Sequence, residues 1–262
     1  MSAGRPAARA WAADRGCGVP PCPSRWRRSR DPARRDEVPS TPGRAHALLF
    51  GPVRPTCRRC LRPTDFCVCA TLQPVASRSR VLLLQHPREA RLAICSAWLA
   101  RIALENAELH RGLCFEDDAR VRALAGSPGA ALLYPGEGSV PAAERAGDPP
   151  DVLVVVDGTW LQAEKMLAAN PLLASLPRLS VGSAERSGYR DLRREPAPHC
   201  LSTIEAVACA LGALERDPSR FEPMRAAFRL MVEKQLACAR GERRSPRHRP
   251  GRGPAGGQWP LP

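Results

Sequence analysis

Residues 152–160 read Val152-Leu153-Val154-Val155-Val156-Asp157-Gly158-Thr159-Trp160. The first five residues are apolar and mostly β-branched, which favours a buried strand. Gly158 permits a sharp turn, and Thr159 can cap the helix that the spacing of residues 161–167 predicts. Asp157 is therefore expected at the carboxyl end of a central strand, the edge at which open α/β sheets bind ligands.

Two other apolar runs end in the same manner. Residues 81–84 run into Gln85-His86-Pro87, and residues 130–134 run into Pro135-Gly136. If the three strands are parallel, their final turns meet at one edge and form a composite site. The chain is therefore predicted to have an α/β fold, with a mostly parallel sheet flanked by helices. We also expect helices over about 88–105 and within 116–125, and a short edge strand at 179–181.

Two more helices are expected near the C-terminus. Ser202 and Glu205 have the spacing of a capping box at the start of a helix over 203–215. An apolar stripe predicts a last helix that ends near residue 239. The capping box explains Ser202 without any function. A helix start that bears hydroxyl groups can also hold a carboxylate or a phosphate, so both interpretations stay open.

Four cysteines form the pattern C-x2-C-x6-C-x-C: Cys57, Cys60, Cys67 and Cys69. Four thiolates at this spacing can close a tetrahedron around Zn2+, and so short a loop would draw much of its folding free energy from the metal. Unmetallated or redox-active cysteines are the alternative. Arginines, among them Arg58, Arg59 and Arg62, surround the motif. They indicate a phosphate-contacting surface, or they only keep the loop soluble.

The charge of the chain lies mostly in its two ends. The net charge is +14 over 262 residues, of which residues 1–45 carry +6 and residues 240–262 carry +5. Both segments are rich in Arg and Pro without periodicity, so we predict disordered basic tails. Between them we expect a zinc knuckle over 46–75 and an α/β domain over 76–239. Basic tails can bind polyanions weakly, although a solvated tail explains the composition equally well.

The eleven cysteines do not form the even framework of a disulfide-rich secreted protein. We therefore expect a reducing compartment, the cytoplasm. The sequence has no apolar run near 18 residues, so no membrane helix is expected. A polar loop over 186–198 mixes an aromatic residue with cations, the composition of a nucleic-acid contact or of an ordinary solvated loop: Tyr189, Arg190, Arg193 and Arg194.

Five motifs in order carry a family resemblance: the Cys57–Cys69 knuckle, His86-Pro87-Arg88-Glu89, Leu133-Tyr134-Pro135-Gly136, Asp157-Gly158-Thr159-Trp160 and Leu201-Ser202-Thr203-Ile204-Glu205. Together they resemble the DTW-domain proteins over roughly residues 54–236. The resemblance implies a tRNA-uridine aminocarboxypropyltransferase. Such an enzyme moves the 3-amino-3-carboxypropyl group of S-adenosylmethionine to N3 of a tRNA uridine. It also implies a fold like that of the knotted (SPOUT-like) α/β methyltransferases, with a trefoil knot.

The resemblance also implies roles for individual residues. Asp157, Thr159 and Trp160 would be catalytic, with Asp157 accepting the uridine N3 proton or orienting the base. Asp157 could instead cap the following helix, and Trp160 could be a core residue. The donor cradle would comprise Leu133, Tyr134, Pro135, Gly136, Leu201, Ser202 and Thr203. His86 is as readily a structural histidine as a ligand-binding one.

Two other functions stay open at this point. One is an S-adenosylmethionine-dependent RNA methyltransferase on the same fold. The other is a zinc-knuckle RNA-binding protein without catalysis. The sequence leaves undecided the oligomeric state, the tRNAs recognised and the uridine that is modified.

Overall fold

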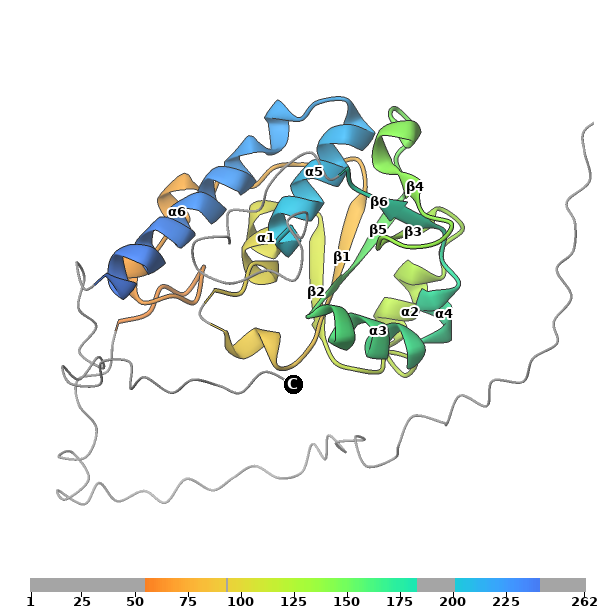
Figure 1. Cartoon of the computed structure of the whole chain (residues 1–262), viewed down its shortest axis with the longest axis horizontal. Helices are drawn as coiled ribbons and strands as arrows, with labels where there is room; N and C mark the ends of the chain where they lie inside the picture. Colours follow the sequence, from red (N-terminus) through yellow and green to blue (C-terminus); the bar gives the residue numbers. More distant parts are fainter. Residues whose placement is uncertain (1–54, 93, 183–200, 241–262) are drawn as a thin grey trace, which may run out of the picture. The chain divides into compact units, whose positions relative to one another are not determined.

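The computed structural model describes residues 55–92, 94–182 and 201–240, which contain one six-stranded sheet (Figure 1). All strand pairs are parallel, and the strand order is β2-β1-β5-β3-β6-β4. The strands are β1 (Arg80–Gln85), β2 (Ala107–Arg111), β3 (Ala130–Leu133), β4 (Val140–Pro141), β5 (Val152–Asp157) and β6 (Arg178–Ser180). The predicted α/β class with a parallel sheet is confirmed.

Helices cover both faces of the sheet (Figure 1). One face carries α1 (Ala97–Ala103), α5 (Thr203–Glu215) and α6 (Glu222–Ala239), and the other carries α2 (Ala119–Ala125), α3 (Trp160–Ala168) and α4 (Pro171–Ala174). Alternate residues of β1 serve the two layers: Leu83 packs with the α5 and α6 side, and Leu82 packs with the α3 side. Burial on both faces explains the continuous apolar runs of the central strands.

The central strands and four of the helices, α2, α3, α5 and α6, follow the sequence prediction. β1, β5 and β3 are neighbours, so the turns after all three strands meet at one sheet edge. Capping boxes begin α3 at Thr159 and α5 at Ser202, and α6 ends at residue 239 as expected.

Two strands were not predicted, and one lies elsewhere in the sheet than expected. β2 is an edge strand with mostly half-buried residues, so its sequence shows no apolar run. β4 has only two residues. The strand near residue 179, β6, was expected at the sheet edge. Because β4 pairs with its outer side, β6 is instead the second strand from that edge.

The predicted continuous helix over 88–105 is wrong. A short 3-10 helix, η4 (Glu89–Arg91), ends at Leu92, whose backbone is extended. The α-helix α1 then begins only at Ala97. The apolar residues Leu92, Ile94 and Cys95 line a pocket instead, which accounts for the helix-like apolar spacing without a helix.

The cysteine motif packs on the same core as the sheet. Its short helices are η2 (Thr64–Phe66) and η3 (Cys69–Thr71). Cys60, Val68 and Leu72 are buried in the cluster that α5 and α6 share, and Lys234 of α6 donates hydrogen bonds to the carbonyl oxygens of Asp65 and Cys67.

Several predictions fall outside the described residues: the tail over 1–45, residues 241–262 of the C-terminal tail, and the loop over 186–198. In the ranges that the structure does describe, none of the helices combines the length and apolar character needed to cross a bilayer.

Candidate active site and metal site

A cavity of about 350 Å³ opens at the carboxyl end of the sheet. Its walls come from the ends of β3, β5 and β6, the first turn of α5 and the segment that precedes α1. Sites for small molecules occupy this range of volumes and this edge of an α/β sheet. The cavity is therefore the candidate active site.

Asp157 is the buried carboxylate of this cavity, with 7% of its surface exposed. Its Oδ1 accepts a hydrogen bond from the Thr203 hydroxyl at 2.5 Å, and its Oδ2 accepts one from Gln85 Nε2 at 2.9 Å. Burial raises the pKa of Asp157, while these two hydrogen bonds and the charge of His86 oppose the rise. Asp157 does not cap α3, since Thr159 does so.

Gln85 lies beside Asp157, as its register partner on β1, and is completely buried. Its Oε1 accepts a hydrogen bond from Arg111 Nε at 3.0 Å, and its Nε2 also donates to Cys95 Sγ at 3.0 Å. The amide therefore joins β2, β5 and the segment before α1.

Trp160 stands at the rim of the cavity. It is 41% exposed, so the alternative of a core tryptophan is wrong. Its ring meets the Tyr134 ring edge to face, with centroids 5.7 Å apart. The guanidinium of Arg178, on β6, lies 5.7 Å from the centroid of the Tyr134 ring. Exposed aromatic faces at a pocket rim can stack on a base or attract a cation.

The first turn of α5 contributes the opposite wall. Ser202 is buried, and its hydroxyl is used in the capping box. The hydroxyl donates to the Glu205 carboxylate and accepts from the Glu205 amide. Thr203 contacts Asp157, and Leu201 completes this part of the lining.

The structure brings most of the predicted site residues together. Those that line the cavity are Leu133, Tyr134, Pro135, Asp157, Thr159, Trp160, Leu201, Ser202 and Thr203. His86 and Gly136 lie outside this lining. The His86 amide donates to the Asp157 carbonyl, and its Nδ1 accepts from the Arg88 amide. These bonds shape the turn after β1, and the cofactor contact of His86 stays a prediction.

Sequence reasoning missed Gln85 and the segment before α1. The missed lining residues include Glu89, Leu92, Ile94, Cys95, Ser96, Ser180 and Val181. The available signal was position: Gln85 is the last residue of β1, directly before the histidine that the sequence analysis selected.

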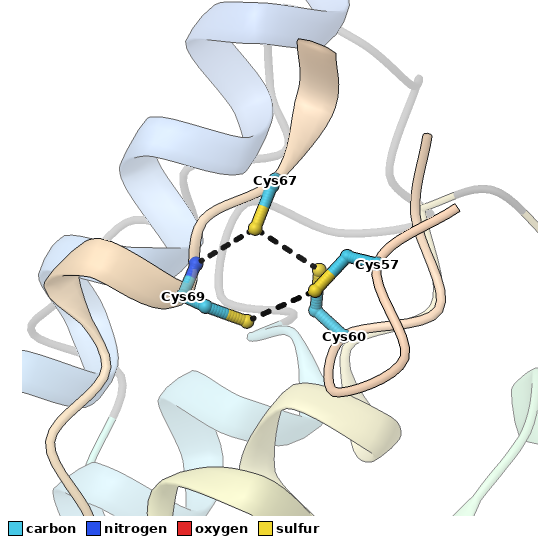
Figure 2. Close-up of side chains that lie close together, drawn as sticks. All are labelled: Cys57, Cys60, Cys67 and Cys69. Carbon is cyan, nitrogen blue, oxygen red and sulfur yellow. Dashed lines mark hydrogen bonds between the residues drawn. The ribbon is translucent and has the colours of Figure 1, made fainter. Parts of the chain in front are cut away.

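The four motif cysteines point their sulfurs at one another (Figure 2). Cys57 Sγ lies 3.7 Å from Cys69 Sγ, and Cys60 Sγ lies 3.8 Å from Cys67 Sγ. Four Zn–S bonds of about 2.3 Å in a tetrahedron place neighbouring sulfurs about 3.8 Å apart. The cluster therefore has the dimensions of a four-thiolate metal site.

The backbone of the first cysteine pair supports this arrangement. Leu61 has a left-handed φ of 58°, and its amide donates to the Cys57 carbonyl. Hydrogen bonds from the backbone of Cys60 and then Arg59 lower the pKa of Cys57 to about 6, which favours its thiolate form. Burial raises the pKa of Cys67 and of Cys69, so the sulfur positions, and not the pKa values, carry the assignment of a candidate metal site.

The three arginines of the motif have different environments. Arg58 and Arg59 are exposed. Arg62 is 8% exposed, and its guanidinium donates to the carbonyl oxygens of Cys60 and Cys95 and to Met231 Sδ. The predicted phosphate contact for Arg62 is therefore corrected, because the side chain is buried and both of its terminal nitrogens donate inside the protein.

Residues 54–236 match the model of the DTW domain family. The chain belongs to this family. The match covers both the cysteine cluster and the cavity, so the DTW domain includes the two sites.

Named relatives of this DTW protein come from animals and plants. The tRNA-uridine aminocarboxypropyltransferase 2 of Drosophila melanogaster is 35% identical over 175 residues, covering 63% of this chain and 68% of the relative. The Mus musculus protein of the same name is 29% identical over 173 residues, covering 63% and 58%. The tRNA-uridine aminocarboxypropyltransferase A of Arabidopsis thaliana is 28% identical over 204 residues, covering 64% and 76%. No solved structure matches the chain.

Proposed function

We propose that this chain transfers the 3-amino-3-carboxypropyl group of S-adenosylmethionine to N3 of a tRNA uridine. The observation that carries the proposal is a buried carboxylate, Asp157, in the cavity of a DTW domain whose named relatives are tRNA-uridine aminocarboxypropyltransferases. In this reaction a bond forms between uridine N3 and the transferred carbon, and the bond from that carbon to sulfur breaks. The N3 proton leaves, and 5′-methylthioadenosine is the second product.

The cavity fits a donor with this mixture of groups. Trp160 and Tyr134 offer aromatic faces for an adenine ring or a sulfonium. The backbone of residues 133–135 and the first turn of α5 would hold the remainder, with the amino-acid carboxylate near the helix start. When bound, the donor supplies an electrophilic carbon beside its positively charged sulfur. The residues of the cavity orient the uridine toward that carbon.

Asp157 is proposed to accept the uridine N3 proton. An ordinary aspartate is a weak base, but burial raises the pKa of Asp157, which strengthens it as a proton acceptor. Thr203 and Gln85 hold both carboxylate oxygens in place. Thr159 keeps the helix start in register through its capping box, and Trp160 follows it directly at the rim.

The other parts of the chain have supporting roles in this proposal. Zn2+ is the metal that suits four sulfur ligands at these distances, and a cytoplasmic location would keep the thiols reduced. Arg58 and Arg59 would contact tRNA phosphates, together with Tyr189, Arg190, Arg193 and Arg194. His86 and Gly136 would support the cradle from outside its lining. The trefoil knot stays a prediction.

Nucleoside mass spectrometry tests the reaction. Purified chain is incubated with S-adenosylmethionine and unmodified tRNA, and the nucleosides are then analysed. The expected product is aminocarboxypropyluridine together with 5′-methylthioadenosine. A methylated nucleoside with S-adenosylhomocysteine would establish the methyltransferase alternative. Tight tRNA binding without donor binding in calorimetry would establish the non-catalytic alternative.

A further inference from the structure

Three polar residues lie in one row across three neighbouring strands. In the strand register, Gln85 of β1 pairs with Arg111 of β2 on one side and with Asp157 of β5 on the other. Each is the last residue of its strand. Their side chains are joined by two hydrogen bonds, Arg111 Nε to Gln85 Oε1 and Gln85 Nε2 to Asp157 Oδ2.

Arg111 decides which way the Gln85 amide points. The amide oxygen and nitrogen are similar in size, so the hydrogen-bond partners choose between the two orientations. A guanidinium can only donate, and Gln85 therefore presents its oxygen to Arg111. Its NH2 group is then directed at Asp157 Oδ2 and Cys95 Sγ.

Arg111 is itself held on its outer side. Its guanidinium carbon lies 5.7 Å from the centroid of the Trp98 ring, and Trp98 Nε1 donates to the Arg59 carbonyl at 2.9 Å. This bracing keeps an otherwise exposed arginine in the position that the amide needs.

We propose that Gln85, oriented by Arg111, is a positioning residue that holds the Asp157 carboxylate in a single orientation at the cavity. This inference rests on the proposed function. It assigns roles to two residues that lie outside the cavity lining. Without the amide donor, Asp157 Oδ2 loses its partner inside a buried site. Within the described part of the chain, the Thr203 hydroxyl is then the one side chain that still donates to the carboxylate, which becomes free to rotate.

Among the residues that the structure describes, four charged or titratable groups bear on Asp157 or its network. His86 lies on the turn after β1 and opposes the burial effect on the pKa of Asp157. Cys95 lies on the segment before α1, and burial raises the pKa of its thiol, with the Asp157 charge adding to that rise. Arg111 acts through Gln85 from β2, Glu89 lines the same cavity, and α5 contributes the neutral hydroxyl of Thr203.

The test replaces Gln85 by methionine, which has a similar length and no hydrogen-bond donor. In Gln85→Met we expect turnover to fall about tenfold to a hundredfold through misorientation, with KM for S-adenosylmethionine changed less than about threefold. The loss of a hydrogen bond to the ionised form raises the pKa of Asp157, so the acid limb of the pH–rate profile moves to higher pH. The matched control is Arg120→Met. Arg120 of α2 forms an ion pair with Glu108 of β2, away from the cavity lining.

Two further variants test the inference without relying on the folding of Gln85→Met alone. Arg111→Met alters an exposed residue and frees the Gln85 amide to turn; we expect a smaller shift of the acid limb in the same direction. Gln85→Glu keeps an acceptor for Arg111 but places a second carboxylate beside Asp157; we expect the largest shift. Acid limbs that coincide with the wild type in folded Gln85→Met and Arg111→Met would overturn the inference.

A direct measurement separates this inference from the proposed reaction. The pKa of the Asp157 carboxyl group is measured by NMR from the pH dependence of its carboxyl-carbon chemical shift. The measurement is made in the wild type and in Gln85→Met and requires no turnover. A rise in the variant supports the positioning role even if tRNA assays find no aminocarboxypropyl product, a result that would overturn only the proposed function. An unchanged Asp157 pKa in an active enzyme would overturn the positioning role alone.

Discussion

The four cysteines of the candidate metal site come from thirteen consecutive residues. The hydrogen-bonded network of Asp157, Gln85, Arg111 and Thr203 instead joins four separate segments, β5, β1, β2 and α5. The arrangement of the cysteine cluster thus depends on local turns and on the metal that its four sulfurs could bind. The cavity is held by the sheet, because adjacent parallel strands deliver Arg111, Gln85 and Asp157 to one row.

This difference predicts how each region responds to a substitution. Loss of one sulfur removes the ligand set on which a small loop depends for folding free energy. Loss of one side chain around Asp157 should leave the sheet intact and act mainly on the chemistry. Arg62 connects the two regions, since it donates to Cys60 in the knuckle and to Cys95 at the cavity.

The largest effect is expected from Cys60→Ala. Cys60 is 1% exposed and belongs to both the sulfur cluster and the core. We expect loss of the bound metal and of more than about 4 kcal/mol in the free energy of unfolding. Metal analysis and urea denaturation measure the two quantities. Cys114→Ser, outside the cluster, is the control and should keep the metal. Unchanged metal content in Cys60→Ala would contradict the assignment of the cysteine cluster as a metal site.

Arg62→Met is expected to come second. The substitution removes three hydrogen bonds from a buried guanidinium, which should cost about 3 kcal/mol in the free energy of unfolding while the metal stays bound. Arg59→Met is the matched control. It removes one side-chain bond, to the Leu72 carbonyl, from an exposed arginine, and it should cost less than about 1 kcal/mol. Equal losses in the two variants would contradict the connecting role of Arg62.

Asp157→Asn should separate catalysis from stability. Turnover is expected to fall at least about a hundredfold because the proton acceptor is lost. Burial raises the pKa of Asp157, so its ionised form destabilises the fold above that pKa, and the penalty disappears as pH falls to the unfolded-state value. The variant should therefore melt at or above the wild-type temperature at neutral pH.

The melting-temperature difference between Asp157→Asn and wild type should shrink as the pH is lowered, because the wild-type carboxyl then becomes neutral. Thermal melts at pH 7 and pH 5 provide the check. A variant with full turnover and intact tRNA binding would rule out the base role.

Trp160→Ala is expected to have the smallest effect. The side chain is 41% exposed, so the free energy of unfolding should change by less than about 0.5 kcal/mol. Loss of the aromatic face should weaken S-adenosylmethionine binding about tenfold, as measured by calorimetry. Leu161→Ala is the control, since Leu161 is 61% exposed on the same helix and does not line the cavity. Identical affinities in both variants would place the donor elsewhere.

Local sequence signals predicted local features well. The cysteine set, the apolar runs of β1, β3 and β5, and the capping boxes at Thr159 and Ser202 each depend on residues close together in the chain. The helix expected over 88–105 failed because its apolar residues pack at a cavity, and a spacing pattern cannot tell a cavity wall from a core.

The sequence by itself determined the α/β class, the cluster of four cysteines and the placement of Asp157 at a strand end, because β-branched runs, cysteine spacing and turn residues act over a few positions. Only the tertiary structure decided that Gln85 and Thr203 donate hydrogen bonds to the Asp157 carboxylate and that Arg62 is buried. The physical reason is strand register. It sets which side chains from distant segments share a row, and neither composition nor spacing in one segment contains that information.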